Sequence, residues 1–143
     1  MTIKFIVSGK PQGKARPRFR KIGNYVSTYN PKQTTEYEKL VKLSAIKQCK
    51  DKLDKEYTGP VKVKIMAFYE PPKSYSNKKQ KLLLNSPHLK KVDADNIAKI
   101  ICDSLNKVAY YDDSQVYSLE VCKYYSEKNR VEVILEYNEE KYE

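Results

Sequence analysis

The sequence predicts a single compact domain of the α/β or α+β class over residues 1–143, in which a mixed β-sheet packs against two main helices. Three observations predict this class. A chain of 143 residues has the usual length of one domain. Apolar and polar residues alternate over 61–69, as in a strand with one buried face. Apolar residues recur at helical spacing over 97–108, as in a helix that packs against a core.

The predicted strands are distributed along the whole chain. The first follows from the β-branched and aromatic residues of 2–8, which end at a loop containing Gly9 and Gly13. A short extended segment is expected near residues 25–28. The remaining strands are expected over 61–69, about 116–124 and 130–137, the last two joined by a turn at 126–129.

Two main helices and one short helix are expected between these strands. Asn30 and Pro31 predict the N-cap and first position of a helix that runs to about Lys50. A short helix is expected over 76–84. The most informative helix starts at residues 93–96, with an apolar stripe and an opposite polar side. The stripe contains Ile97, Ile101, Leu105 and Val108, and the polar side contains Asp95, Lys99, Asp103 and Asn106.

Charge is distributed very unevenly along the chain. The formal net charge is +10, yet residues 1–35 contain eight basic residues and no acid, and residues 71–92 contain six more and no acid. Residues 93–113 contain five of the seven aspartates. Two basic stretches followed by an acidic cluster favour an anionic partner and a separate carboxylate site.

Several function classes are excluded by the sequence. The chain has no long apolar run, so we expect no membrane association and a cytoplasmic location. Three widely spaced cysteines favour reduced thiols. The segment 9–15 departs from a phosphate-binding loop in glycine spacing and in Ala15, which argues against a nucleotide cofactor. His88 is the single histidine, is expected at the surface, and makes histidine-based catalysis very unlikely.

The basic tract 14–20 has the composition of a nucleic-acid contact. It contains three of the four arginines, interleaved with Pro17 and Phe19, and arginine suits bidentate contact with phosphate. A solvated loop is the alternative interpretation. Phe19 or Tyr25 could stack on bases, and packing in the core or a loop is an equally good reading for both. The predicted phosphate contacts are Lys10, Lys14, Arg16, Arg18 and Arg20.

The acidic cluster predicts a site for Mg²⁺, with Mn²⁺ as a substitute. Asp93 and Asp95 are two residues apart and would share one side of an extended segment, and Asp112 and Asp113 follow before the next strand. An N-cap for Asp93 and a turn for Asp112 and Asp113 are the ordinary alternatives. A helix over 95–106 would be about 17 Å long, so Asp113 must return along it or come from a partner subunit.

Three motifs follow one another between residue 9 and about residue 123. They are Gly9-x-Pro11-x-x-Lys14-x-Arg16-Pro17-Arg18, Asp93-x-Asp95-Asn96-x-x-Lys99 with Asp103 after it, and Asp112-Asp113-Ser114-Gln115-Val116. In this order the motifs resemble the RusA family of Holliday-junction resolvases. The departure is Val92, where the family commonly has proline.

The resemblance implies a homodimeric endonuclease of bacteria, phages or prophages that cuts four-way DNA junctions by paired symmetric nicks in recombination and repair, leaving 5′-phosphate ends. It implies Asp93, Asp95 and Asp113 as Mg²⁺ ligands, and Lys99 as a cation near the scissile phosphate. It implies Asp112 either as a weaker ligand or as a group that supports the ligands without binding the ion. The ordinary reading of Lys99 is an i,i+4 ion pair on the helix surface. Two alternatives stay open: a nucleic-acid-binding protein without catalysis, and a Mg²⁺ nuclease acting on a broader set of branched or flap DNA.

Overall fold

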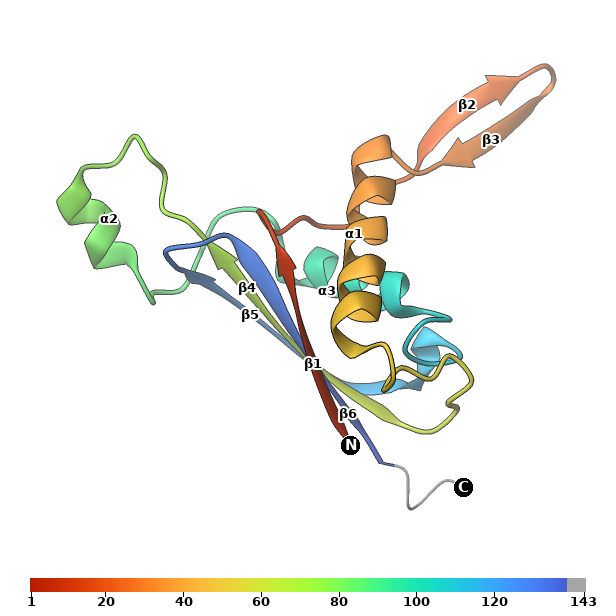
Figure 1. The fold of residues 1–143 in the computed structure, drawn as a ribbon. Helices are drawn as coiled ribbons and strands as arrows, with labels where there is room; N and C mark the ends of the chain where they lie inside the picture. Colours follow the sequence, from red (N-terminus) through yellow and green to blue (C-terminus); the bar gives the residue numbers. More distant parts are fainter. Residues whose placement is uncertain (139–143) are drawn as a thin grey trace.

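A computed structural model describes residues 1–138 and contains one four-stranded mixed sheet (Figure 1). The strand order is β1-β6-β4-β5. β6 pairs antiparallel with both β1 and β4, whereas β4 and β5 are parallel. The bounds are β1 (Thr2–Ser8), β4 (Val61–Tyr69), β5 (Val116–Tyr125) and β6 (Arg130–Tyr137).

Two long helices cover one face of the sheet, which confirms the predicted fold class. α1 (Lys32–Cys49) packs on β1, and α3 (Ala94–Leu105) packs on β5 and on α1. The parallel pairing of β4 and β5 requires a long crossover, which contains the short helix α2 (Asn77–Leu83), α3 and the 3₁₀ turn η1 (Asp113–Gln115). No helix within residues 1–138 has the length and apolar character needed to cross a membrane.

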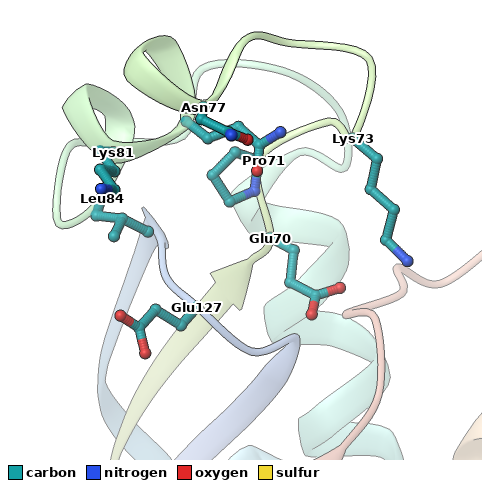
Figure 2. Close-up of a pocket in the computed structure, with 8 residues that line it drawn as sticks. Glu70, Pro71, Lys73, Asn77, Lys81, Leu84 and Glu127 are labelled. Atoms are coloured by element: carbon teal, nitrogen blue, oxygen red, sulfur yellow. The ribbon is translucent and has the colours of Figure 1, made fainter.

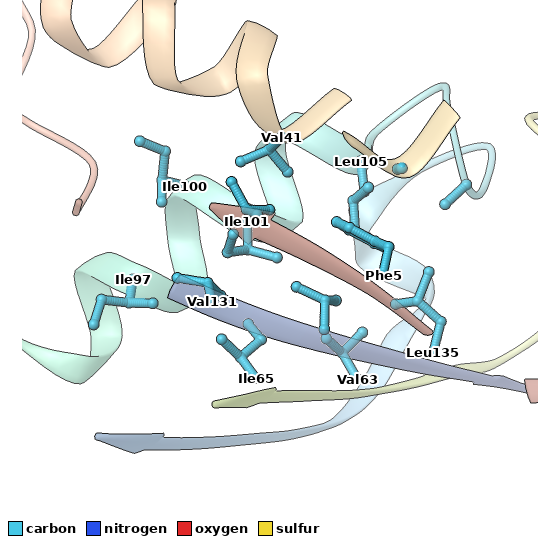
Figure 3. Close-up of a cluster of buried hydrophobic side chains, with 14 of the residues drawn as sticks. Phe5, Val41, Val63, Ile65, Ile97, Ile100, Ile101, Leu105, Val131 and Leu135 are labelled. Carbon is cyan, nitrogen blue, oxygen red and sulfur yellow. The ribbon is translucent and has the colours of Figure 1, made fainter. Parts of the chain in front are cut away.

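The core lies between this helix layer and the sheet (Figure 3). Alternate residues of β4, including Val63 and Ile65, point into it, as the alternation over 61–69 predicts. α3 contributes Ile97, Ile101 and Leu105, the first three positions of the predicted apolar stripe. Burial of these side chains removes apolar surface from water and fixes α3 on the sheet.

The opposite face of the sheet is charged. Lys4 pairs with Glu132 at 3.0 Å, and Lys64 pairs with Glu120 at 4.0 Å. Burial opposes ionisation of Glu132, but hydrogen bonds from Lys4 and Arg130 outweigh it and lower the pKa of that carboxyl group. Lys4 and Lys64 on this face are therefore paired with carboxylates.

A second, two-stranded sheet stands apart from the first. β2 (Arg18–Ile22) and β3 (Tyr25–Tyr29) form a hairpin that projects beyond the N-terminal end of α1 (Figure 1). Gly23 begins its two-residue turn with φ of 58°, a conformation that glycine adopts without steric cost. The extended segment near 25–28 was predicted, but β2 was not.

Two local predictions were wrong. His88 is not a surface residue: it is 8% exposed, and its ring stacks on Tyr69 at 3.9 Å between centroids, with Tyr125 at its edge. Burial and the charges of nearby lysines lower its pKa. The first long helix begins at Lys32, one residue later than predicted, with Pro31 at the N-cap position and no side-chain cap. Proline lacks the side-chain oxygen that a cap needs.

Candidate functional site

The N-terminal end of α3 presents two carboxylates and an ammonium group to solvent. Asp93 occupies the N-cap position, but its side chain makes no cap hydrogen bond. Asp95 lies in the first turn and Lys99 one turn later, and all three are exposed. Within residues 1–138 none of the three forms a salt bridge. The ordinary roles of Asp93 as a capping side chain and of Lys99 as a helix ion pair are therefore not realised.

A second set of carboxylates lies at the C-terminal end of α3. Asp113, in η1, lies beside Asp103 in the last turn of the helix. Burial raises the pKa of Asp113, and a hydrogen bond with Asp103 and the charges of Asp112 and Asp103 raise it further. Burial, together with the charges of Asp103 and Asp113, raises the pKa of the Cys102 thiol to about 11. Negative charge is thus concentrated at this end of α3.

Asp112 has a structural task in this arrangement. Its Oδ2 accepts a hydrogen bond from the backbone N–H of Ser114 at 3.0 Å, which lowers the pKa of the carboxyl group. Gln115 accepts from the backbone N–H of Asp112 and donates to the carbonyls of Tyr57 and Gly59 at 2.8 Å. The pair forms a capping box that fastens η1 to the loop before β4.

Sequence reasoning missed this role of Gln115. An aspartate followed three residues later by a glutamine is the spacing of a capping box, and residues 112–115 show it. The pairing of Asp103 with Asp113 was also missed, because no sequence pattern states that a turn returns to the end of the preceding helix. Tyr110 holds the segment after α3 against the end of that helix. Its side chain is fully buried, and its hydroxyl donates a hydrogen bond to the carbonyl of Cys102 at 2.7 Å.

Lys14 connects the N-terminal segment, residues 9–17 between β1 and β2, to α1 and α3. Its side chain is 13% exposed, and its Nζ lies 3.3 Å from Glu38 of α1 and 3.5 Å from Asp103 of α3. Its backbone N–H donates to the carbonyl of Asn96 at 3.0 Å. The ammonium group that the sequence predicts to contact phosphate is thus engaged by two carboxylates, one of which is the neighbour of Asp113.

Gly13 allows this close approach of the segment to α3. A Cβ at this position would lie 2.3 Å from Cγ1 of Val92 and 3.0 Å from Cβ of Asn96. Any side chain would therefore force the segment away from the helix. The adjacent Lys14 could not then keep its two ion pairs.

The two sets of carboxylates, Asp93 with Asp95 and Asp103 with Asp113, lie apart within one chain. Asp95 and Asp103 are eight residues apart, which is about 12 Å along the helix axis. Within residues 1–138 no three His, Cys, Asp or Glu side chains lie close enough together to hold a metal ion. The chemistry of the donors nevertheless fits Mg²⁺, since carboxylate oxygens are its preferred ligands. The crowding of Asp113 by Asp103 and Asp112 would also be relieved by a cation.

The remaining predicted DNA contacts are on the surface. Lys10, Arg16, Arg18 and Arg20 are all exposed. Lys10 and Arg18 line a hollow of about 380 Å³ between the N-terminal segment, the start of α1 and Val92, and none of the described residues in its wall is acidic. A cationic, acid-free hollow of this kind suits backbone phosphate.

A second hollow, of about 320 Å³, lies between α2, the end of β4 and the β5–β6 turn (Figure 2). Its wall contains Glu70 and Glu127 together with Lys73 and Lys81, so its charges are mixed. None of the predicted catalytic residues lines it. Its chemistry therefore sets it apart from the acidic end of α3.

Comparison with known proteins gives two matches. A family model described as endodeoxyribonuclease RusA matches residues 8–136. The Bacillus subtilis (strain 168) protein YqaN, described as uncharacterized, is 36% identical over 137 residues, which cover 93% of this chain and 94% of YqaN. Both matches extend over the N-terminal segment, α3 and η1 together.

The Lys14 bridge predicts energetic coupling between the N-terminal segment and α1. Lys14→Met should lower the free energy of unfolding by about 1–3 kcal/mol, because it leaves two half-buried carboxylates without their cation. In a double-mutant cycle with Glu38→Gln, urea unfolding should give a coupling of about 1 kcal/mol. The matched control is Lys32→Met with Glu36→Gln, an exposed i,i+4 pair, where coupling should not exceed about 0.5 kcal/mol. Equal coupling in both cycles would show that the pair of Lys14 with Glu38 is no stronger than an exposed ion pair on a helix surface.

The carboxylate pair predicts opposite effects for two neighbouring aspartates. In EDTA, Asp113→Asn should raise the free energy of unfolding by up to about 1 kcal/mol, because it removes repulsion between partly exposed charges. Asp112→Ala should lower it, because η1 loses its cap. Urea titrations at low and high salt measure both effects, and only the Asp113 effect should shrink as salt rises. Destabilisation by Asp113→Asn would show that the pair is not repulsive.

Proposed function

The chain belongs to the RusA family of endodeoxyribonucleases, and on this basis we propose that it is a Mg²⁺-dependent endonuclease that resolves four-way (Holliday) DNA junctions. It acts in recombination and repair by paired symmetric nicks that leave 5′-phosphate and 3′-hydroxyl ends. One observation supports the catalytic part of the proposal most strongly. Asp93, Asp95 and Lys99 are exposed along the N-terminal half of α3, and within residues 1–138 Asp93 makes no side-chain cap bond and none of the three forms a salt bridge.

We assign the metal ligands to Asp93, Asp95 and Asp113. Mg²⁺ bound there would lower the pKa of a water molecule and neutralise charge on the phosphate that is attacked. Asp93 and Asp95 are positioned by the start of α3, and Asp113 by the η1 turn that Gln115 fastens. Asp112 is left out of the ligand set, because its carboxylate caps η1.

Two arrangements would bring Asp113 to the other two ligands. In the first, Asp113 of the same chain approaches Asp93 and Asp95, which requires residues 106–113 to leave the position in which Tyr110 is buried and Gln115 fastens η1. In the second, Asp113 comes from a second copy of the chain, as the sequence analysis allows. A homodimer is part of the proposal in either case, because two-fold symmetry of the protein matches two nicks placed symmetrically on a junction.

The cationic side chains divide into two roles. Lys99 faces solvent one turn from Asp95, where its ammonium group would contact the scissile phosphate and stabilise charge that develops on it. Lys10, Arg16, Arg18 and Arg20 would hold phosphates of the junction arms, which positions the DNA without reading its sequence. Lys14 is a positioning residue, since its ammonium group is engaged by Glu38 and Asp103.

Asp95→Asn should abolish Mg²⁺-dependent cleavage of a mobile four-way junction, because it removes a ligand charge, while binding to the junction persists. The measurement is a denaturing gel for cleavage and a mobility-shift assay in EDTA for binding. Asp51 is an exposed aspartate that follows the C-terminal end of α1. The matched control is Asp51→Asn, which should retain both cleavage and binding. Loss of binding together with cleavage would instead indicate that Asp95 stabilises the fold.

The same gel separates the competing functions when a flap and a linear duplex are included with and without Mg²⁺. Cleavage of the flap as readily as the junction favours the broader nuclease, and no cleavage of any substrate favours a binding protein. A mixture of Asp95→Asn and Asp113→Asn chains then locates Asp113. Recovered nicking means that a second copy supplies it, because a mixed dimer contains one complete site only in that arrangement.

Replacement of Arg16 and Arg18 by glutamine should weaken junction binding and reduce the slope of log K against log salt by about 2, since two phosphate contacts are lost. Fluorescence anisotropy at several salt concentrations measures the slope. Lys47→Gln with Lys55→Gln removes the same charge elsewhere on the surface and should leave the slope unchanged. An unchanged slope in the arginine variant would remove these residues from the interface.

A further inference from the structure

The β2–β3 hairpin exposes aromatic side chains on both of its faces. Phe19 is 75% exposed and Tyr25 is 62% exposed. Every residue of β2 is exposed, and so is every residue of β3 except Ser27, which is half-buried. A two-stranded sheet with no buried face is at best marginally stable in water, and large exposed apolar groups on it indicate that another surface covers them.

Strand register assigns these side chains to faces. Residues directly opposite each other in an antiparallel pair point to the same side, and Phe19 is opposite Thr28 while Tyr25 is opposite Ile22. Phe19 and Ile22 are three apart on one strand, so they point to opposite sides. The hairpin is thus a thin ribbon with Phe19 on one face and Tyr25 on the other.

The charge of the hairpin identifies the chemistry of the surface that covers it. Arg18, Arg20 and Lys21 lie on β2, and residues 1–35 contain no acid. The guanidinium of Arg20 lies 4.9 Å from the centre of the Tyr29 ring, which holds this cation at the surface of the ribbon. A second copy of the chain has the same basic hairpin and a net charge of +10, so contact between two hairpins would be repulsive. Nucleic acid offers both phosphates and aromatic bases.

We propose that the β2–β3 hairpin enters the branch point of a DNA junction and stacks Phe19 and Tyr25 on bases exposed at the crossover. This inference rests on the proposed function, in that it names the part of the chain that distinguishes a branch from a continuous duplex. Stacking on aromatic side chains requires unstacked bases, and a wedge inserted between base steps must pay for opening them. At a branch point the stack is already interrupted, so insertion there needs less disruption than in a linear duplex.

The test uses the full chain in EDTA, so that no cleavage is needed. The probe is a four-way junction with 2-aminopurine at the branch point, an adenine analogue whose fluorescence rises when it loses its stacking neighbours. A linear duplex with the same labelled strand is the comparison DNA. The variants are Phe19→Ala, Tyr25→Ala and the double variant. Leu43→Ala is the matched control, because Leu43 is 64% exposed on α1, outside the hairpin.

Wild-type protein should raise the fluorescence of the junction and leave that of the duplex unchanged. Each single variant should weaken junction binding about tenfold and lower the fluorescence change. Duplex affinity and salt dependence should stay within about twofold of wild type, because all cations remain. The double variant should keep the wild-type unfolding temperature, since neither ring is in the core. If it fails to fold, the single variants supply the same comparison.

Three results would overturn the proposal. The first is a wild-type fluorescence change that persists in both single variants. The second is an equal loss of junction and duplex affinity. The third is a change of oligomeric state in sedimentation, which would identify the hairpin as a contact between copies. Junction cleavage in Mg²⁺ with no fluorescence change would reject the hairpin role and leave the proposed function intact, whereas a fluorescence change without cleavage would do the reverse.

Discussion

The crossing of the N-terminal segment over α3 determines the geometry of the acidic region. Gly13 brings two backbones together where a Cβ would lie 2.3 Å from Val92, and Lys14 then joins α1 and α3 through Glu38 and Asp103. The ion pairs are half-buried, so water screens them less than it screens the pairs on the sheet surface. One loop therefore sets the spacing of the helices and the orientation of the carboxylate next to Asp113. The arginine tract leaves this loop toward the hairpin, which connects the acidic and basic parts of the molecule.

The two groups of carboxylates differ in how firmly they are held. Asp112 is fixed by the capping box, and the segment before η1 is anchored by Tyr110, whose hydroxyl bonds the carbonyl of Cys102. At the start of α3, Asp93 makes no side-chain cap bond, and within residues 1–138 neither Asp93 nor Asp95 forms a salt bridge. Placement of reactive side chains at the ends of a rigid helix keeps their backbones fixed while their side chains remain free to meet a ligand. The electrostatic cost of crowding negative charge is confined to the end of α3 where Lys14 offsets it.

Most of the sheet and both main helices could be predicted, because each has one buried face and therefore a readable period. Val63 and Ile65 alternate with lysines, and Ile97, Ile101 and Leu105 recur along one side of α3. β2 was missed because both its faces are exposed, so Arg18–Ile22 has no burial pattern. The burial of His88 depends on stacking with Tyr69, 19 residues earlier in the chain. The sequence left the separation of Asp95 from Asp113 open for a similar reason. The residue types predicted a site, but the positions of the two side chains depend on the path of the turn after α3, which no sequence pattern shows.

The pairing of β1 with β6 has a consequence for how the chain reaches this fold. Thr2 pairs with Glu136 and Ser8 with Arg130, so among the described residues the only neighbour of β1 in the sheet is the strand farthest from it in sequence. Contacts so distant in sequence are formed slowly, because the loop between them must close before they contribute. During synthesis the apolar side of β1, with Ile3 and Phe5, stays uncovered until β6 emerges. The sheet can therefore be completed only after β6 has been synthesised, and until then the exposed apolar side of β1 favours aggregation.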